Sequence, residues 1–282
     1  MAQRGRPRGT GARGAAPTSV QALDRAIEVM RVVAAGDGST LTALAERTGL
    51  APSTLHRLLT TLAAHGFVET NEADQTWVVG VEAFRVGQAF QRRAKAAAAG
   101  RPVMRDLMET TGETANIGIF EGGDVVFIAQ VESAEPIRAF FRAGERRAAH
   151  ASGIGKALLA EMDEARVTRT LRGRTLERFT ASTLADPAAL LADLAATRAR
   201  GFAIDDEERN VGMRCIAAAI FDENGEAVAG LSISGPTQRI DGARIAVLGP
   251  QVRAAAARIT AAIGGRVPDR AGSPSGRPLG EC

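Results

Sequence analysis

The feature that most constrains this chain is the segment at residues 41–62, LTALAERTGLAPSTLHRLLTTL, which predicts two short helices joined by a tight turn. The first helix ends at Gly49, because glycine readily adopts the left-handed backbone that follows many helices. Pro52 stands where a first helical residue belongs, since its missing N–H would be unpaired there anyway. Leucines then recur at i, i+3, i+4 and i+7, and they predict one buried stripe formed by Leu55, Leu58, Leu59 and Leu62.

Polar side chains without any acid occupy the opposite face of the second helix. Hydroxyl and imidazole groups can read base edges and phosphates in a major groove, and an arginine can bind guanine with two hydrogen bonds. We therefore predict that this face contacts duplex DNA through Ser53, Thr54, His56, Arg57 and Thr60. The alternative is an ordinary helical hairpin on the protein surface, because such patterns also occur by chance.

The segments on either side favour the DNA-binding interpretation. Residues 19–35 form an amphipathic pattern, and the expected contribution of that helix to a three-helix core is Val20, Leu23, Ile27, Met30 and Val33. Residues 66–70 and 76–79 read as two strands around a polar turn. Three helices followed by a hairpin predict a winged helix-turn-helix.

A basic arm precedes this predicted domain. Residues 1–14 contain four arginines and no acid, and the order Arg4-Gly5-Arg6-Pro7 resembles the core of an AT-hook, which lies in a narrow A·T minor groove. We expect Arg4, Arg6 and Arg8 to contact DNA, because a flexible cationic arm can follow phosphates. The alternative is a solvated leader with no contact.

Length and composition bound the remaining possibilities. At 282 residues, 45% of them hydrophobic, the chain can build two domains with separate cores. We see no signal peptide and no apolar run near the roughly 18 residues of a membrane-spanning helix. Cys215 and Cys282 are too few for a disulfide framework or a cysteine-rich zinc site. We expect a cytoplasmic protein with no cofactor, no metal and no membrane partner.

The second half of the chain alternates between helical and strand patterns. A helix at residues 81–99 is expected to stop at Gly100 and Pro102, because the residue before a proline avoids the α region. Strands are expected at residues 115–120, 125–131, 137–142 and 227–234, with another from about Cys215. Helices are expected at residues 102–111, 163–171, 186–200 and 243–263, the last interrupted at Gly249 and Pro250.

Residues 150–160, HASGIGKALLA, lead from small residues and glycines directly into an apolar helix. Free backbone N–H groups at such a helix start can bind an anion. The segment is not a Walker A loop, because Ala157 stands where serine or threonine is required and His150 stands where the first glycine is required. The sequence therefore indicates an anion site that does not bind a nucleotide.

The order of these motifs resembles the IclR family of bacterial transcriptional regulators. The resemblance rests on Arg25-Ala26-Ile27, the run from Thr48 to Leu59, the run from His150 to Ala160, Asp206-Glu207-Glu208 with Gly212, and Leu231 to Pro236. It implies an α+β protein with a winged helix-turn-helix, a linker helix used in dimerisation, and a GAF-like α/β effector domain with an antiparallel sheet. It also implies dimers or tetramers on palindromic operators.

This resemblance divides the chain into five expected segments. They are a disordered basic arm at 1–18, the DNA-binding domain at 19–80, the linker helix at 81–100, the effector-binding domain at 101–266 and a disordered tail at 267–282. The pocket residues are similar to those of glyoxylate-responsive members. The effector contacts that this implies are the backbone amides around Gly155 and Lys156 and the side chains of Asp205, Cys215, Ser232 and Ser234.

The chemistry of these residues suits a small 2-oxo acid. Amides and hydroxyls can bind a carboxylate, and Asp205 can accept from the hydroxyls of a hydrated aldehyde. Cys215 could also be a small core residue, and the serines could satisfy backbone groups. We expect a regulator whose DNA affinity changes when glyoxylate, or another small carboxylate such as pyruvate, is bound. The competing hypothesis is an enzyme that uses Cys215 as nucleophile and His150 as base.

Overall fold

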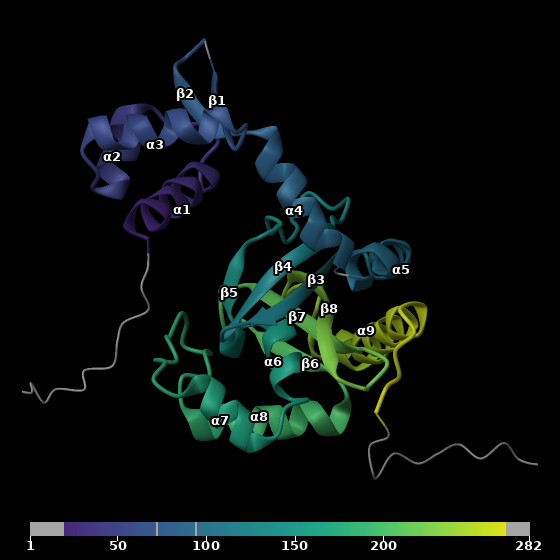
Figure 1. The fold of residues 1–282 in the computed structure, drawn as a ribbon. Coiled ribbons are helices and arrows are strands. Elements are labelled where there is room, and N and C mark those ends of the chain that lie inside the picture. Colours follow the sequence, from purple (N-terminus) through teal and green to yellow (C-terminus); the bar gives the residue numbers. More distant parts are fainter. Residues whose placement is uncertain (1–19, 72, 94, 269–282) are drawn as a thin grey trace, which may run out of the picture. The chain divides into compact units, whose positions relative to one another are not determined.

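A computed structural model describes residues 20–71, 73–93 and 95–268 of the chain (Figure 1). Arg4, Arg6 and Arg8 and the predicted tail from residue 269 onward lie outside the described residues. The chain divides into two compact units, the first ending at Phe90 and the second beginning at Gln91. Among the described residues, no helix combines the length and the apolar character needed to cross a membrane.

The first unit is a winged helix-turn-helix, as predicted. Its elements are α1 (Gln21–Ala34), α2 (Leu41–Thr48), α3 (Pro52–Ala64) and the antiparallel strands β1 (Val68–Asn71) and β2 (Thr76–Val79). Gly49 ends α2 with a φ of 66°, in the left-handed region that glycine tolerates. Pro52 is the first residue of α3. The turn chemistry in the sequence therefore fixes the angle at which α3 leaves α2.

The orientation of α1 agrees with the prediction only in the second half of the helix, where Val33 is buried and Met30 packs against the core. The core of this unit contains Val29 and Val33 of α1 together with Leu44, Leu55, Leu59 and Val68. By contrast, the expected core residues Val20, Leu23 and Ile27 are 65%, 58% and 44% exposed. The helix carries two apolar stripes, and the one through Val29 and Val33 packs against α2 and α3. The other stripe remains on the surface of the unit.

The predicted helix break at Gly100 and Pro102 is wrong. After α4 (Val81–Arg93), helix α5 runs without a stop from Lys95 to Thr111 and contains Pro102. A Cβ at Gly100 would lie 2.6 Å from the Cδ1 atom of Ile117, so the glycine lets the helix lie close to the sheet. Burial of α5 outweighs the hydrogen bond that the proline removes.

The predicted interruption of the last helix is wrong for the same reason. Helix α9 is continuous from Gly242 to Ala262 and contains Pro250. A Cβ at Gly249 would overlap the ring of Phe202, so this glycine is a point of close packing and does not end the helix. Both errors arise because a glycine within two residues of a proline also predicts a turn when only the sequence is considered.

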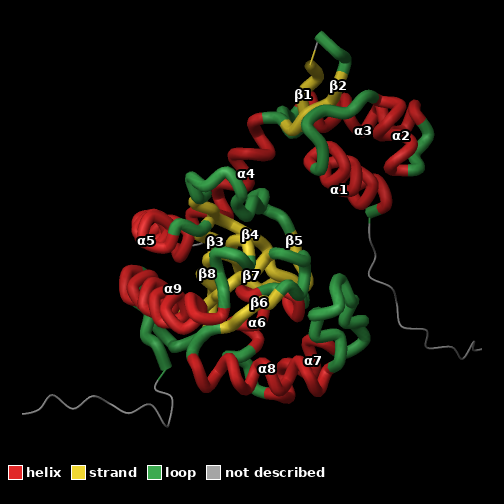
Figure 2. Tube along the Cα trace, turned by 180° about the vertical axis from the view of Figure 1, so that it is seen from behind, coloured by secondary structure: helices red, strands yellow, loops and turns green. Residues whose placement is uncertain are grey.

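The second unit is built on one six-stranded antiparallel sheet with the order β5-β4-β3-β8-β7-β6. Its strands are β3 (Thr114–Glu121), β4 (Asp124–Val131), β5 (Arg146–Ala148), β6 (Ala203–Asp206), β7 (Met213–Phe221) and β8 (Ala227–Pro236). Helices α5 and α9 pack on one face of the sheet, and α6 (Gly153–Leu159) with α8 (Pro187–Arg200) packs on the other (Figure 2). Helix α7 (Glu164–Leu171) precedes α8.

Two strand assignments need correction. Residues 137–142 do not form a strand, because side chains donate hydrogen bonds to their carbonyl groups. The hydroxyl of Thr114 donates to the carbonyl of Ala139 at 2.9 Å, and Arg239 donates to that of Ile137 at 2.9 Å. No strand was predicted at residues 203–206, yet these residues form β6 and pair with β7. A strand of four residues with two acids carries too weak a pattern to be predicted.

Helix α6 packs closely against the preceding turn at Gly155, where any larger residue would force the backbone to shift. A Cβ at Gly155 would overlap the backbone of Ala149, in the 3-10 turn that precedes the helix. The amide of Gly155 also donates to the hydroxyl of Ser152 at 3.4 Å. The whole helix is buried, so it has little freedom to move away from that turn.

Replacement of this glycine tests the close approach. We expect Gly155→Ala to lower the free energy of unfolding of the second unit by about 1–3 kcal/mol, because the added methyl group must displace rigid backbone. Gly242→Ala is the matched control, since nothing lies within 4 Å of a Cβ there. Urea unfolding followed by circular dichroism measures both. Equal unfolding midpoints for the two variants would contradict the close packing of α6 against this turn.

Candidate functional site

The polar face of α3 is open to solvent. Leu55 and Leu59 are fully buried on the opposite side of the helix, so the side chains that remain accessible are those predicted to meet DNA. Ser53, His56, Arg57 and Thr60 are exposed, and Thr54 is half-buried. The helix contains no acidic residue that would repel phosphates. The face therefore has the shape and charge that a recognition helix needs.

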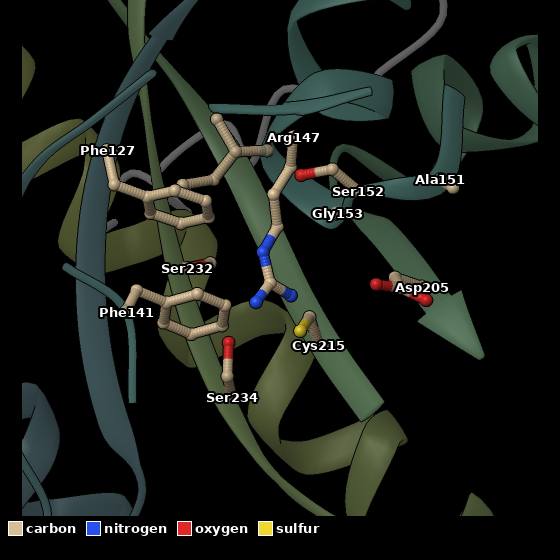
Figure 3. Close-up of a pocket in the computed structure, with 11 residues that line it drawn as sticks. Phe127, Phe141, Arg147, Ala151, Ser152, Gly153, Asp205, Cys215, Ser232 and Ser234 are labelled. Atoms are coloured by element: carbon tan, nitrogen blue, oxygen red, sulfur yellow. The ribbon is translucent and has the colours of Figure 1, made fainter. Parts of the chain in front are cut away.

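A second candidate site is a small pocket in the other unit (Figure 3). The pocket is nearly closed in this structure, with a cavity of about 10 Å³, which is room for roughly one water molecule. Strands of the sheet and the start of α6 supply its walls. The lining residues are Phe127, Phe141, Arg147, Ala151, Ser152, Gly153, Ile154, Asp205, Cys215, Ser232 and Ser234.

The register of three neighbouring strands brings the predicted side chains together. Asp205 on β6 pairs with Cys215 on β7, and Cys215 pairs in turn with Ser234 on β8. Ser232 lies two residues before Ser234 and therefore on the same face of β8. All four line the pocket. Residues separated by up to 29 positions in the sequence thus form one row across the sheet edge.

The two amides expected from the sequence are used elsewhere. Gly155 donates its N–H to the hydroxyl of Ser152, and Lys156 donates its N–H to the carbonyl of Ser152 at 2.9 Å. The helix begins at Gly153, and its first two residues, Gly153 and Ile154, line the pocket. The predicted residues Gly155 and Lys156 lie two positions further along the helix.

The side chain of Lys156 is fully buried in a cluster of acids beyond the pocket lining. Its Nζ atom forms ion pairs with Glu208 and, at 3.0 Å, with Asp193 of α8. Glu208 in turn donates its backbone N–H to the Oδ1 atom of Asp205 at 2.9 Å. The lysine therefore holds Glu208, and through it Asp205, in position without lining the pocket itself.

Sequence reasoning missed the two aromatic rings and the arginine that line the pocket. Phe127 and Phe141 stack with ring centroids 4.5 Å apart, and the guanidinium of Arg147 lies 4.5 Å from the centroid of Phe141. Strand β5, which carries Arg147, has only three residues and therefore no readable period. The one available signal was the pair Arg146-Arg147, two arginines on opposite faces of any strand.

Burial controls the protonation of the pocket groups. It raises the pKa of Asp205 to about 6, although the N–H of Glu208 and the positive charge of Lys156 act in the opposite direction. Asp205 is therefore mostly ionised at neutral pH and can accept hydrogen bonds. Burial also raises the pKa of the thiol of Cys215, a half-buried residue, so the sulfur stays protonated.

These properties favour binding over covalent catalysis. A neutral thiol is a poor nucleophile. The expected base, His150, has its Nε2 atom 2.9 Å from the carbonyl of Glu177 and stacks on Phe179. Among the described residues, no group of three His, Cys, Asp or Glu side chains could hold a metal ion. The pocket thus offers donors, one acceptor and a fixed cation to a small polar ligand.

Two family models match the chain, one for each unit. The IclR helix-turn-helix domain matches residues 22–72, and the bacterial transcriptional regulator IclR C-terminal matches residues 88–261. The HTH-type transcriptional regulator BhcR of Paracoccus denitrificans is 53% identical over 92% of this chain and 93% of its own length. The transcriptional repressor IclR of Escherichia coli is 42% identical over 87% of this chain and 91% of its own length.

Further matches agree with these. The acetate operon repressor of Salmonella typhimurium is 42% identical over 87% of this chain and 91% of its own length. The crystal structure of IclR from Thermotoga maritima has a TM-score of 0.73 at 27% identity, covering 86% of this chain and 99% of that one. These relatives are named as regulators and repressors, and none is named as an enzyme. This chain belongs to the IclR family of DNA-binding bacterial transcriptional regulators.

Proposed function

We propose that this regulator binds a small 2-oxo acid, glyoxylate above all, in the pocket of the second unit and changes its operator affinity in response. The observation that carries the proposal is the row formed by Asp205, Cys215 and Ser234 across three paired strands. Because this row and the neighbouring Ser232 combine two hydroxyl groups with a carboxylate, they can bind both ends of a hydrated oxo acid.

The small pocket favours an acid of two or three carbons over a larger effector. Its cavity of about 10 Å³ holds one water-sized group, so even a small acid requires the lining side chains to move apart. The related Salmonella protein is named for the acetate operon, which also concerns a two-carbon acid. Pyruvate is the alternative effector, because one additional methyl group could contact the ring of Phe127 or Phe141.

Operator recognition is assigned to the exposed face of α3, with Ser53, Thr54, His56, Arg57 and Thr60 as contacts. We further propose a homodimer or a tetramer made of two dimers on a palindromic operator, since a protein two-fold axis matches two half-sites. The apolar side chains that α4 exposes support self-association. Val81, Phe84 and Val86 of that helix are 63%, 63% and 55% exposed.

Calorimetry of the purified protein with glyoxylate, pyruvate, glycolate and oxalate, together with a gel shift of the protein's own promoter, tests the effector class. We expect glyoxylate to bind, to alter the gel shift and to be recovered unchanged, because the effect is differential binding to two conformations. Loss of glyoxylate during incubation would indicate chemistry instead.

Removal of one pocket hydroxyl tests the site. Ser234→Ala should weaken glyoxylate binding about 10-fold, because a hydrogen bond to a charged group is lost. Operator affinity in the absence of the acid should stay the same. Ser182→Ala, at an exposed serine, is the matched control. Calorimetry that gives the same affinity for both variants would place the effector elsewhere.

Removal of the arginine of α3 tests operator recognition. Arg57→Ala should weaken specific operator binding by about 1–3 kcal/mol, as expected for loss of a bidentate base contact. Arg31→Ala removes the same charge from α1, where Arg31 pairs with Glu28 on the surface, and should have a smaller effect. Fluorescence anisotropy with operator and scrambled DNA measures both, and unchanged discrimination by Arg57→Ala would remove the assignment.

Deletion of residues 1–14 tests the basic arm. The deletion removes four arginines, so the slope of log affinity against log salt should become shallower by about three to four if each neutralises one phosphate. Titration of the full chain and the truncated chain with operator DNA at several salt concentrations gives the two slopes. Identical slopes would show that the arm makes no contact with DNA.

A further inference from the structure

Two neighbouring arginines on β5 have opposite surroundings. Arg146 lies on the surface, where its Nη1 atom is 2.6 Å from Glu121 and its Nε atom is 3.4 Å from Asp124. Its Nη2 atom donates to the carbonyl of Glu121 at 3.1 Å. Every nitrogen of this guanidinium therefore has a partner. Such a residue is explained by the surface ion pairs that it makes.

Arg147 points the other way, into the pocket, because side chains alternate along a strand. Its Nε atom donates to Glu145 at 2.7 Å and its side chain is 18% exposed. Within the part of the chain that the structure describes, neither terminal amino group has a hydrogen-bond partner. Figure 3 shows the guanidinium beside the ring of Phe141, pointing toward the thiol of Cys215 and the hydroxyl of Ser234.

This geometry is that of a preorganised anion receptor. The bond to Glu145 fixes the inner nitrogen, and the stacking on Phe141 fixes the plane of the guanidinium. The two outer nitrogens then form a planar fork, which matches the two oxygens of a carboxylate. Because the side chain is already held in place, a ligand would have little rotamer entropy to remove.

The opposite wall of the pocket has the opposite charge. Asp205 faces the same space and is mostly ionised at neutral pH. Asp205 would repel a second carboxylate placed there, whereas a hydroxyl group could donate a hydrogen bond to it. The pocket is therefore polarised, with a cation at one end and a hydrogen-bond acceptor at the other.

We propose that Arg147 binds the effector's carboxylate with its two terminal amino groups, and that Asp205 at the other end requires a hydroxyl donor and excludes a second carboxylate. The ligand class is thus a small monocarboxylate with an oxo or hydroxyl group on the next carbon. This inference rests on the proposed function, because it assumes that the pocket is the effector site. It adds that Arg147 selects for the negative charge, and that the carboxylate of the effector lies at the Arg147 end of the pocket.

Calorimetry on the full chain with three probes tests the proposal. Glyoxylate carries one carboxylate and a hydrated aldehyde, glycolaldehyde carries no charge, and oxalate carries two carboxylates. The wild-type protein should prefer glyoxylate over both others. In Arg147→Met, glyoxylate affinity should fall by roughly 10- to 100-fold, the worth of hydrogen bonds to a charged group, while glycolaldehyde affinity should change little.

The neighbouring arginine is the matched control. Arg146→Met removes the same charge from the same strand but from the outer face, so it should bind all three probes as the wild type does. A role of Arg147 in folding alone would weaken glyoxylate and glycolaldehyde alike, and that result would overturn the proposal. If Arg147→Met does not fold, Arg147→Lys decides, because it keeps the charge but loses the fork. Reduced glyoxylate affinity supports the proposal, and wild-type affinity refutes it.

Asp205→Asn tests the other end of the pocket. The amide keeps an oxygen that can accept from the N–H of Glu208, yet it removes the negative charge. Oxalate should therefore bind this variant more tightly than it binds the wild type, and an unchanged oxalate affinity would refute the assigned direction. Failure of the wild type to bind any small acid would refute the proposed effector class, whereas equal glyoxylate binding by Arg147→Met and wild type would refute the role of Arg147 alone.

Discussion

The second unit depends on one buried lysine. The Nζ atom of Lys156 joins α6 to Asp193 of α8 and to Glu208 in the turn after β6. Burial of these charges is costly, and loss of the lysine would leave the carboxylate of Glu208 buried without its counter-ion, at a cost of about 3–5 kcal/mol. Burial accordingly raises the pKa of Glu208 to about 7, against the attraction of the lysine. Because Glu208 also donates its N–H to Asp205, the position of the pocket carboxylate is set by this cluster.

Local chemistry explains which parts of the fold were predictable. The helix-turn-helix followed from Gly49, Pro52 and the leucine period, all within a single segment, and the hairpin followed from its turn. Long-range packing decided the rest. Helix α1 carries two apolar stripes, and only the contact with α2 and α3 determines that Val29 is buried while Leu23 is exposed. The sequence contains both stripes but not the choice between them.

Two glycines also show that local sequence alone does not determine where a helix ends. Gly100, two residues before Pro102, and Gly249, directly before Pro250, predict a helix end, because nothing local separates a turn from a close approach. In the folded chain both glycines instead let a helix approach Ile117 or Phe202. Among the residues that line the pocket, the resemblance marked Asp205 and Ser234 but not Arg147, whose short strand carries no period. Membership of a regulator family was therefore easier to predict than the full pocket lining.

The two sets of charged groups in this unit differ in what faces them. Around Lys156 the charges pair with one another within the same chain and hold α6, α8 and the turn after β6 together, although the Oδ2 atom of Asp193 and the Oε2 atom of Glu208 accept no hydrogen bond within the described residues. Across the pocket, Arg147 is tied to Glu145 only through its inner nitrogen, and Asp205 accepts from one backbone N–H. Both therefore retain hydrogen-bonding capacity directed at the same small space. A protein retains such capacity next to a buried cluster at a cost in stability, and a ligand with a carboxylate at one end and a hydroxyl at the other would satisfy both groups at once.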